Sequence, residues 1–191
     1  MPDMRPQIIA QYAEWTALSA LRSGAPIKSR RDVYTAIRLI DFTKLFERGR
    51  GPISAAEFNG WHAGAVADLI AGQPRLSVGW VAKILNVYLK TRCYIGAHGR
   101  HHLNEAIHPP IDAGLWLGLR RRFSGLPDIL ERSNCVVRIK DITDYSCYAR
   151  IIDGCRAAAK ELGCRSRSSS SGQARSSTRL RRGRTYVEPD E

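Results

Sequence analysis

The segment from Ser77 to Cys93, SVGWVAKILNVYLKTRC, constrains the fold of this chain more than any other stretch. With residues about 100° apart around a helix axis, apolar side chains cover most of its circumference. They are Val78, Trp80, Val81, Ile84, Leu85, Val87, Tyr88 and Leu89. A helix of this kind is stable only when other elements pack on most of its sides, so the chain is expected to fold as a bundle around it.

Further helices are predicted on both sides of this one, because apolar residues recur at steps of three and four. The first covers residues 6–22, and its core-facing stripe is expected to be Ile8, Ile9, Tyr12, Trp15, Leu18 and Leu21. The others are expected at 30–48, 54–71, 112–123 and 143–163.

Short local signals place the ends of these helices. SAAE at 54–57 has the form of a capping box, and Asp112 is a good N-cap for the helix after it. Pro109 and Pro110 exclude a helix through that point. The run CVVRIK is β-branched but has no obvious partner strand. The predicted fold class is therefore mainly α, a single globular bundle of about six or seven helices.

Positive charge is the strongest global signal, at +12 for 191 residues. Residues 165–191 carry seven arginines and three acids, with many serines and almost no apolar residues. Such a composition cannot offset the entropy of folding, so this segment is predicted to be a disordered basic tail. Residues 1–164 are then the helical domain, and with 23 basic and 15 acidic residues they are basic as well. An excess of that size favours nucleic acid as the partner.

Several other classes are not supported by any pattern. The chain begins without an apolar signal segment and contains no run long enough to cross a membrane. Five widely spaced cysteines indicate reduced thiols, so a cytoplasmic protein is expected. No phosphate-binding loop, dinucleotide fingerprint or catalytic triad motif is present, and no cofactor or metal is predicted.

The helix at 77–93 keeps a narrow polar strip of Gly79, Lys83, Asn86 and Lys90. Two interpretations are open. The strip can be solvated, with both lysines serving solubility. Alternatively it can line a cleft, where partial desolvation would lower the pKa of a lysine and make it a nucleophile. The turn PPID would then contribute the carboxylate of Asp112.

A VG turn that opens a lysine-bearing apolar helix, followed by a Pro-x-Asp element before another helix, resembles the helix-hairpin-helix DNA glycosylase superfamily, in particular its archaeal-type 8-oxoguanine glycosylases. The resemblance covers residues 77–117. It implies that Ser77 to Gly79 form the hairpin turn that holds the DNA backbone. It also implies that Lys83 attacks the sugar C1′ and that Asp112 supports positive charge on the sugar.

This chemistry is coherent. Cleavage of an N-glycosidic bond builds oxocarbenium character that a carboxylate stabilises, and a neutral lysine can then form a Schiff base. A flipped-out base needs stacking and hydrogen-bonding groups, for which Trp80, Trp116 and Asn86 are the candidates.

Cations around the cleft would contact phosphates. Lys90, Arg100, Arg120 and Arg121 are the candidates, although arginines at a helix C-terminus are also favoured by the helix dipole alone. The loop with histidines at 98, 101 and 102 has no assigned role.

The predicted function is a DNA-binding helical protein, with a glycosylase/lyase-like site that uses Lys83 and Asp112 and with double-stranded DNA as partner. The alternative is a non-catalytic helical domain that binds nucleic acid or another protein.

Overall fold

The computed structural model describes residues 4–21, 24–47 and 49–172, with side chains up to residue 163. Within these ranges the chain is helical and contains no strand, which confirms the predicted mainly α fold class. The elements are α1 (Arg5–Ser19), α2 (Arg30–Arg38), α3 (Thr43–Phe46), α4 (Ala55–Gly72), α5 (Val78–Lys90), the π-helix η1 (Thr91–Ile95), α6 (Leu103–Ala106), α7 (Ala113–Arg122), α8 (Pro127–Ser133), the 3-10 helix η2 (Ile139–Asp141) and α9 (Tyr145–Gly172).

The chain divides into two compact units, residues 1–158 and 159–191. The core and the sites described below belong to the first unit. The backbone of α9 is helical through Gly172, which includes the first residues of the predicted tail. The rest of that predicted tail, 173–191, lies outside the described residues.

Local signals form the helix ends as expected. The hydroxyl of Ser54 accepts a hydrogen bond from the Glu57 amide, and the carboxylate of Asp112 accepts one from the Leu115 amide. The predicted helix 30–48 is divided into α2 and α3, because the carboxylate of Asp41 accepts from the Thr43 amide and starts a new turn. The run CVVRIK is not a strand and leads into the short helix η2.

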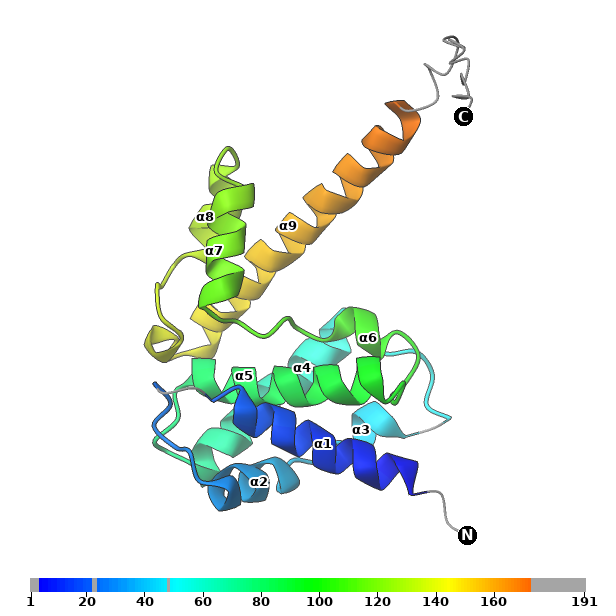
Figure 1. Ribbon diagram of the computed structural model, residues 1–191, viewed down its shortest axis with the longest axis vertical. Helices are drawn as coiled ribbons and strands as arrows, with labels where there is room; N and C mark the ends of the chain where they lie inside the picture. The colour runs from blue at the N-terminus through cyan, green and yellow to red at the C-terminus, as the bar shows by residue number, and fades with distance from the viewer. Residues whose placement is uncertain (1–3, 22–23, 48, 173–191) are drawn as a thin grey trace, which may run out of the picture. The chain divides into compact units, whose positions relative to one another are not determined.

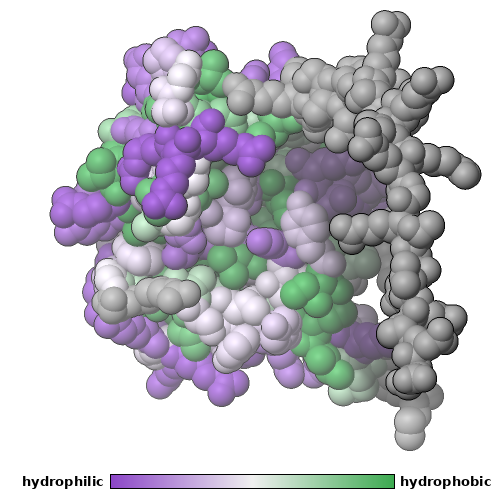
Figure 2. Space-filling model, turned by 45° about the horizontal axis from the view of Figure 1, so that its top comes forward, coloured by the Kyte–Doolittle hydropathy of each residue, from purple (hydrophilic) through white to green (hydrophobic). Residues whose placement is uncertain are grey.

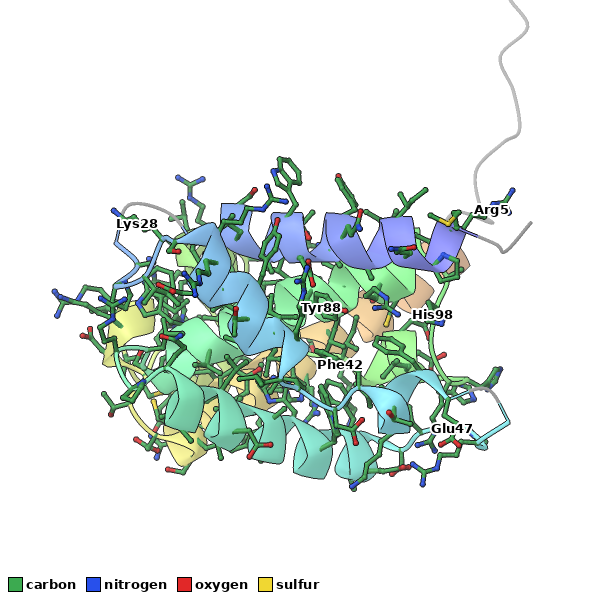
Figure 3. The ribbon with its side chains drawn as sticks, turned by 90° about the horizontal axis from the view of Figure 1, so that it is seen from below. Arg5, Lys28, Phe42, Glu47, Tyr88 and His98 are labelled. Carbon is green, nitrogen blue, oxygen red and sulfur yellow. The ribbon has the colours of Figure 1, made fainter. Side chains whose placement is uncertain are left out.

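Helix α5 is the centre of the first unit. It contacts α1 and α4, and α2 contacts both of these neighbours (Figure 1). Ten of its thirteen residues are buried, as its apolar circumference predicts. Aromatic residues join it to the α2–α3 region, where Phe42 and Tyr88 have ring centroids 4.8 Å apart (Figure 3).

The predicted inward stripe of the first helix is wrong for its largest members. Ile8, Tyr12 and Trp15 are 59%, 45% and 54% exposed. Alanines at 13 and 17 are buried instead, and small side chains let α1 lie close to α5. Apolar residues also reach the surface between hydrophilic ones in Figure 2. No described helix is long and apolar enough to cross a membrane.

The orientation of α1 is set by polar contacts on its inner side. Glu14 is buried and accepts two hydrogen bonds from the guanidinium of Arg38, at 2.7 and 2.9 Å. The hydroxyls of Thr16 and Thr91 lie 2.8 Å apart. A buried carboxylate is costly without its cation, so this pair holds the alanine face inward and the aromatic face outward.

Candidate functional site

The polar strip of α5 is divided between core and surface. Lys90 is exposed, whereas Lys83 is half-buried with its Nζ 5.7 Å from the ring centroid of Trp80. Trp80 itself is buried. Gly79 is also buried, and its amide donates to the carbonyl of Ile142 at 3.0 Å. The first turn of α5 therefore packs on the segment around η2.

Asn86 is fully buried, so it faces neither water nor an open cleft. Its Nδ2 donates to the carbonyl of Pro109 at 3.3 Å and to the hydroxyl of Tyr148 at 2.9 Å. Its Oδ1 lies 3.1 Å from Nε2 of His62. Because a proline carbonyl only accepts, the amide nitrogen must point to Pro109. Oδ1 then accepts from His62 Nε2–H, which leaves His62 Nδ1 as an acceptor.

The hydrogen bonds on both sides of Asn86 form one continuous series, in which each residue donates to the next. The hydroxyl of Tyr145 donates to Nδ1 of His62 at 2.9 Å. On the other side, the hydroxyl of Tyr148 donates to Nδ1 of His108 at 2.9 Å. Nε2 of His108 then donates to Oδ1 of Asn59, also at 2.9 Å. We call these six residues, including Asn86, the histidine network.

The histidine network reaches the surface at one end. Oδ1 of Asn59 also accepts from Nη2 of Arg156 at 2.8 Å. Arg156 is exposed and pairs with Asp153 at 3.3 Å. The network thus ties α4, α5, the loop before α7 and the first turns of α9 into one polar assembly inside the apolar core.

Burial keeps both histidines of the network neutral. It lowers the pKa of His62 to about 4, against the opposing effect of its hydrogen bond to Asn86. It lowers the pKa of His108 to about 2, and repulsion from Arg156, and from His62 whenever that ring is protonated, lowers it further. Burial also raises the pKa of Tyr145 to about 12. All four imidazole nitrogens of His62 and His108 form hydrogen bonds within the protein. The network therefore has a structural role, and neither imidazole has a nitrogen left for a substrate or metal.

Sequence reasoning missed His62 as the partner of Asn86, and His108 as a further member of the same network. A signal was present, because His62 lies one turn after Phe58 and one turn before Val66, both buried. A histidine on an apolar helix face requires a hidden polar partner. That partner comes from another helix 24 positions away, which periodicity within one helix cannot identify.

The predicted aspartate is an exposed helix cap. Asp112 opens α7, and its carboxylate accepts from the Leu115 amide at 2.9 Å. Trp116, one turn later, is only 2% exposed and its Nε1 donates to the carbonyl of Ser133 at 2.7 Å. Trp116 therefore joins α7 to α8 in the core and does not present a face to an incoming base.

The structure does bring together the two elements that carry the lysine and the aspartate. The hydrogen bond from Asn86 to Pro109 joins α5 to the PPID turn. Lys83 lies three residues before Asn86, and Asp112 three residues after Pro109. The contact between helix and turn runs through the buried Asn86, and this hydrogen bond involves neither Lys83 nor Asp112.

Arg100 has a structural role instead of the predicted phosphate contact. Its side chain is 5% exposed and pairs with Glu57 at 2.5 Å. Its guanidinium also donates to the carbonyls of Lys44, Gly51 and Pro52. Arg100 therefore fastens the segment between α3 and α4, and its donors are already used.

An open cavity of about 670 Å³ lies between the α3 segment and α4. Its walls carry three acidic and three basic side chains, so its charge does not favour a polyanion. They are Asp41, Glu57, Asp68, Lys44, Arg50 and Arg100. Lys83 and Asp112, the predicted nucleophile and carboxylate, are not among the described residues that line this cavity.

The other basic candidates, Arg120 and Arg121, are exposed in the last turn of α7, together with Arg122. In the histidine loop, Nδ1 of His98 accepts from buried Arg92 at 2.6 Å, while His102 pairs with Glu105. The rings of His101 and His102 have centroids 4.0 Å apart. Among the described residues, no group of three or more His, Cys, Asp or Glu side chains could hold a metal ion.

Comparisons with known proteins give no relative: no family model matches the chain, and neither a curated protein nor a solved structure matches it.

Proposed function

We propose that this protein binds nucleic acid, with double-stranded DNA as its partner, through the exposed arginines at the end of α7. The observation that carries the proposal is that Arg120, Arg121 and Arg122 are all exposed on a short, well-anchored helix. Trp116 and its bond to Ser133 hold that helix in place. Clustered arginines on a fixed element suit the spaced charges of a phosphate backbone.

The distribution of acidic residues supports this proposal. Several carboxylates of the domain are partners of arginines or cap helices. Glu14, Glu57, Asp141 and Asp153 pair with arginines, and Asp41, Asp112 and Asp144 accept from backbone amides. Residues 1–164 carry 23 basic and 15 acidic residues, so cations remain in excess of these pairs, and the exposed arginines of α7 are among the cations that a polyanion can reach.

The test is fluorescence anisotropy of a labelled duplex with the full chain, over a series of salt concentrations. We compare the wild type with the triple variant Arg120→Gln, Arg121→Gln, Arg122→Gln. Each lost phosphate contact is expected to lower the slope of log affinity against log salt by about 0.9, so the slope falls by up to about 2.7. The control is Arg50→Gln with Arg138→Gln, since both arginines are exposed and pair with acids. Equal slopes for wild type and triple variant would rule out this surface.

A second candidate function is a lysine-dependent lyase of the glycosylase kind. The observation that favours it is the hydrogen bond from Asn86 to Pro109, which joins the lysine helix to the aspartate turn. Lys83 is also half-buried, with its Nζ 5.7 Å from the ring centroid of Trp80.

Borohydride trapping on duplexes that contain 8-oxoguanine, uracil or an abasic site tests this second candidate. A covalent adduct that disappears in Lys83→Ala and persists in Lys90→Ala would identify the nucleophile. Lys90 is a matched control because it lies on the same helix and is exposed. Absence of an adduct, with salt-dependent binding intact, leaves the binding function alone.

A further inference from the structure

The outward face of α1 carries a continuous apolar ridge. Met4, Ile8, Tyr12 and Trp15 are 54%, 59%, 45% and 54% exposed, and they follow one another at steps of four, four and three. That spacing places them along one side of a helix. The rings of Tyr12 and Trp15 are stacked, with centroids 5.6 Å apart. In Figure 3 α1 lies along one edge of the molecule, and side chains point from its outer side away from the other helices.

The size of this ridge marks an interaction surface. An aromatic side chain carries about 150–250 Å² of surface, so the half-exposed Tyr12 and Trp15 together leave roughly 200 Å² open. With Met4 and Ile8 the ridge reaches the range of about 300–600 Å² that is typical of functional patches. Scattered apolar residues need no explanation, but four in register on one helix do.

The ridge is nearly free of charge in a chain of net charge +12. Within α1 the charged residues are Arg5 and Glu14, and Glu14 is buried against Arg38. A helix that lies on a membrane surface typically carries several lysines or arginines beside its apolar face. A phosphate-binding surface needs them as well. The chemistry of this face therefore fits another apolar protein surface.

We infer that the ridge binds a second copy of this chain, with the two α1 helices antiparallel about a two-fold axis near residue 10. In that arrangement two residues face each other across the axis when their numbers add to 20. Ile8 of each copy then packs against Tyr12 of the other copy. A two-fold interface requires this kind of self-complementarity.

The charges of the same arrangement are complementary. Position 5 lies opposite position 15, so Arg5 of each copy meets the Trp15 ring of the other, where a cation–π contact is favourable. Arg5 also lies near the C-terminal end of the other α1, the negative end of its dipole. The antiparallel order thus places the exposed cation of each helix where the other copy attracts it, and keeps the two cations apart.

The test is sedimentation velocity of the full chain from about 1 to about 100 µM, the range in which an interface of modest area dissociates. Salt of about 0.5 M screens surface charges, and an apolar interface is expected to persist there. Trp15→Lys is expected to raise the dimer dissociation constant by about 100-fold or more, since a buried aromatic anchor is lost twice per dimer and each new lysine faces Arg5 of the partner copy. The control is Leu39→Lys, because Leu39 is 71% exposed and lies outside α1.

The register is tested by a charge exchange. Ile8→Lys and Tyr12→Glu are each expected to abolish the dimer, whereas the double variant restores it, because lysine and glutamate then face each other across the axis. A parallel pairing would place lysine against lysine and would not be restored.

Three results would overturn the inference. They are a wild-type chain that stays monomeric at about 100 µM, a dimer that survives Trp15→Lys, and a monomer whose Trp15 mediates binding to phosphatidylcholine vesicles. Because the ridge is exposed, unchanged far-ultraviolet circular dichroism is expected for each variant. The outcome is independent of nucleic-acid binding, which is measured on α7.

Discussion

The histidine network should make the protein unusually sensitive to mild acid. His62 and His108 have folded pKa values of about 4 and about 2, whereas an unfolded histidine titrates near 6.5. Above pH 6.5 both states hold these imidazoles neutral, and the histidines do not change the free energy of unfolding with pH. Below pH 6.5 the unfolded chain binds two protons that the folded chain excludes, so stability falls as pH falls.

The magnitude follows from linkage. Well below pH 6.5 each histidine contributes about 1.36 kcal/mol per pH unit, so the slope of the pair approaches about 2.7 kcal/mol per unit near pH 5. Because the unfolded imidazoles are only half protonated at pH 6.5, the loss from pH 6.5 to pH 5 is about 3 kcal/mol, a large part of the roughly 5–15 kcal/mol that stabilises a typical domain. Carboxylates with lowered pKa values, such as Glu57 and Asp141, lose their stabilising contribution only as pH falls toward their unfolded pKa values near 4. Above about pH 5 the histidines therefore dominate the slope.

The assay is urea unfolding followed by tryptophan fluorescence at half-unit steps from pH 5 to pH 7.5. His62→Gln keeps an amide that can donate to Asn86 and removes one titrating group, so its slope is expected to fall to about 1.4 kcal/mol per pH unit. His101→Gln is the control, because His101 is exposed and should leave the slope unchanged. A wild-type slope below about 1 kcal/mol per unit, or an unchanged slope in His62→Gln, would refute buried neutral histidines.

Two further predictions concern packing and thiols. Gly79→Ala should lower the free energy of unfolding by more than about 2 kcal/mol, since its Cβ would overlap the carbonyl oxygen of Ile139, a backbone atom. Gly60→Ala in α4, where a Cβ meets no atom within 4 Å, should instead raise the free energy of unfolding by up to about 1 kcal/mol. Chemical denaturation measures both variants. The sulfurs of Cys135 and Cys147 lie 3.3 Å apart, so oxidised glutathione should take two electrons and two protons from the two thiols and leave one disulfide between them. Mass spectrometry should detect this disulfide as a cross-linked peptide. A thiol that forms only a mixed disulfide with glutathione would contradict the prediction.

Helix ends were predictable because their causes are local. The capping pairs at Ser54 and Asp112 lie within three residues of their partners, and both form as the sequence indicates. The burial of α5 was predictable too, because its apolar circumference leaves no other environment for it. These features depend on short-range chemistry that can be read without knowing the partner helix.

The orientation of α1 and the role of Asn86 were not predictable in the same way. Trp15 looks like a core residue from its spacing, but the face that turns inward is decided by the pairing of Glu14 with Arg38, 24 positions away. Asn86 looks like a surface or cleft residue until His62 supplies its partner, also 24 positions away. In both cases one long-range polar contact outweighs the periodicity of the helix.

The one-way order of hydrogen bonds through the core also limits how this sequence can diverge. His62, Tyr148 and His108 each donate to one neighbour and accept from another, whereas Asn86 accepts from His62 and donates to both Pro109 and Tyr148. Loss of the polar groups of one of them leaves two or more buried groups unsatisfied, at about 1–3 kcal/mol each. Replacing all four with apolar residues of similar volume leaves fewer unsatisfied groups, chiefly the carbonyl of Pro109. Descendants of this chain should therefore keep the four together or lose them together, and a lineage that carries only some of them should be rare.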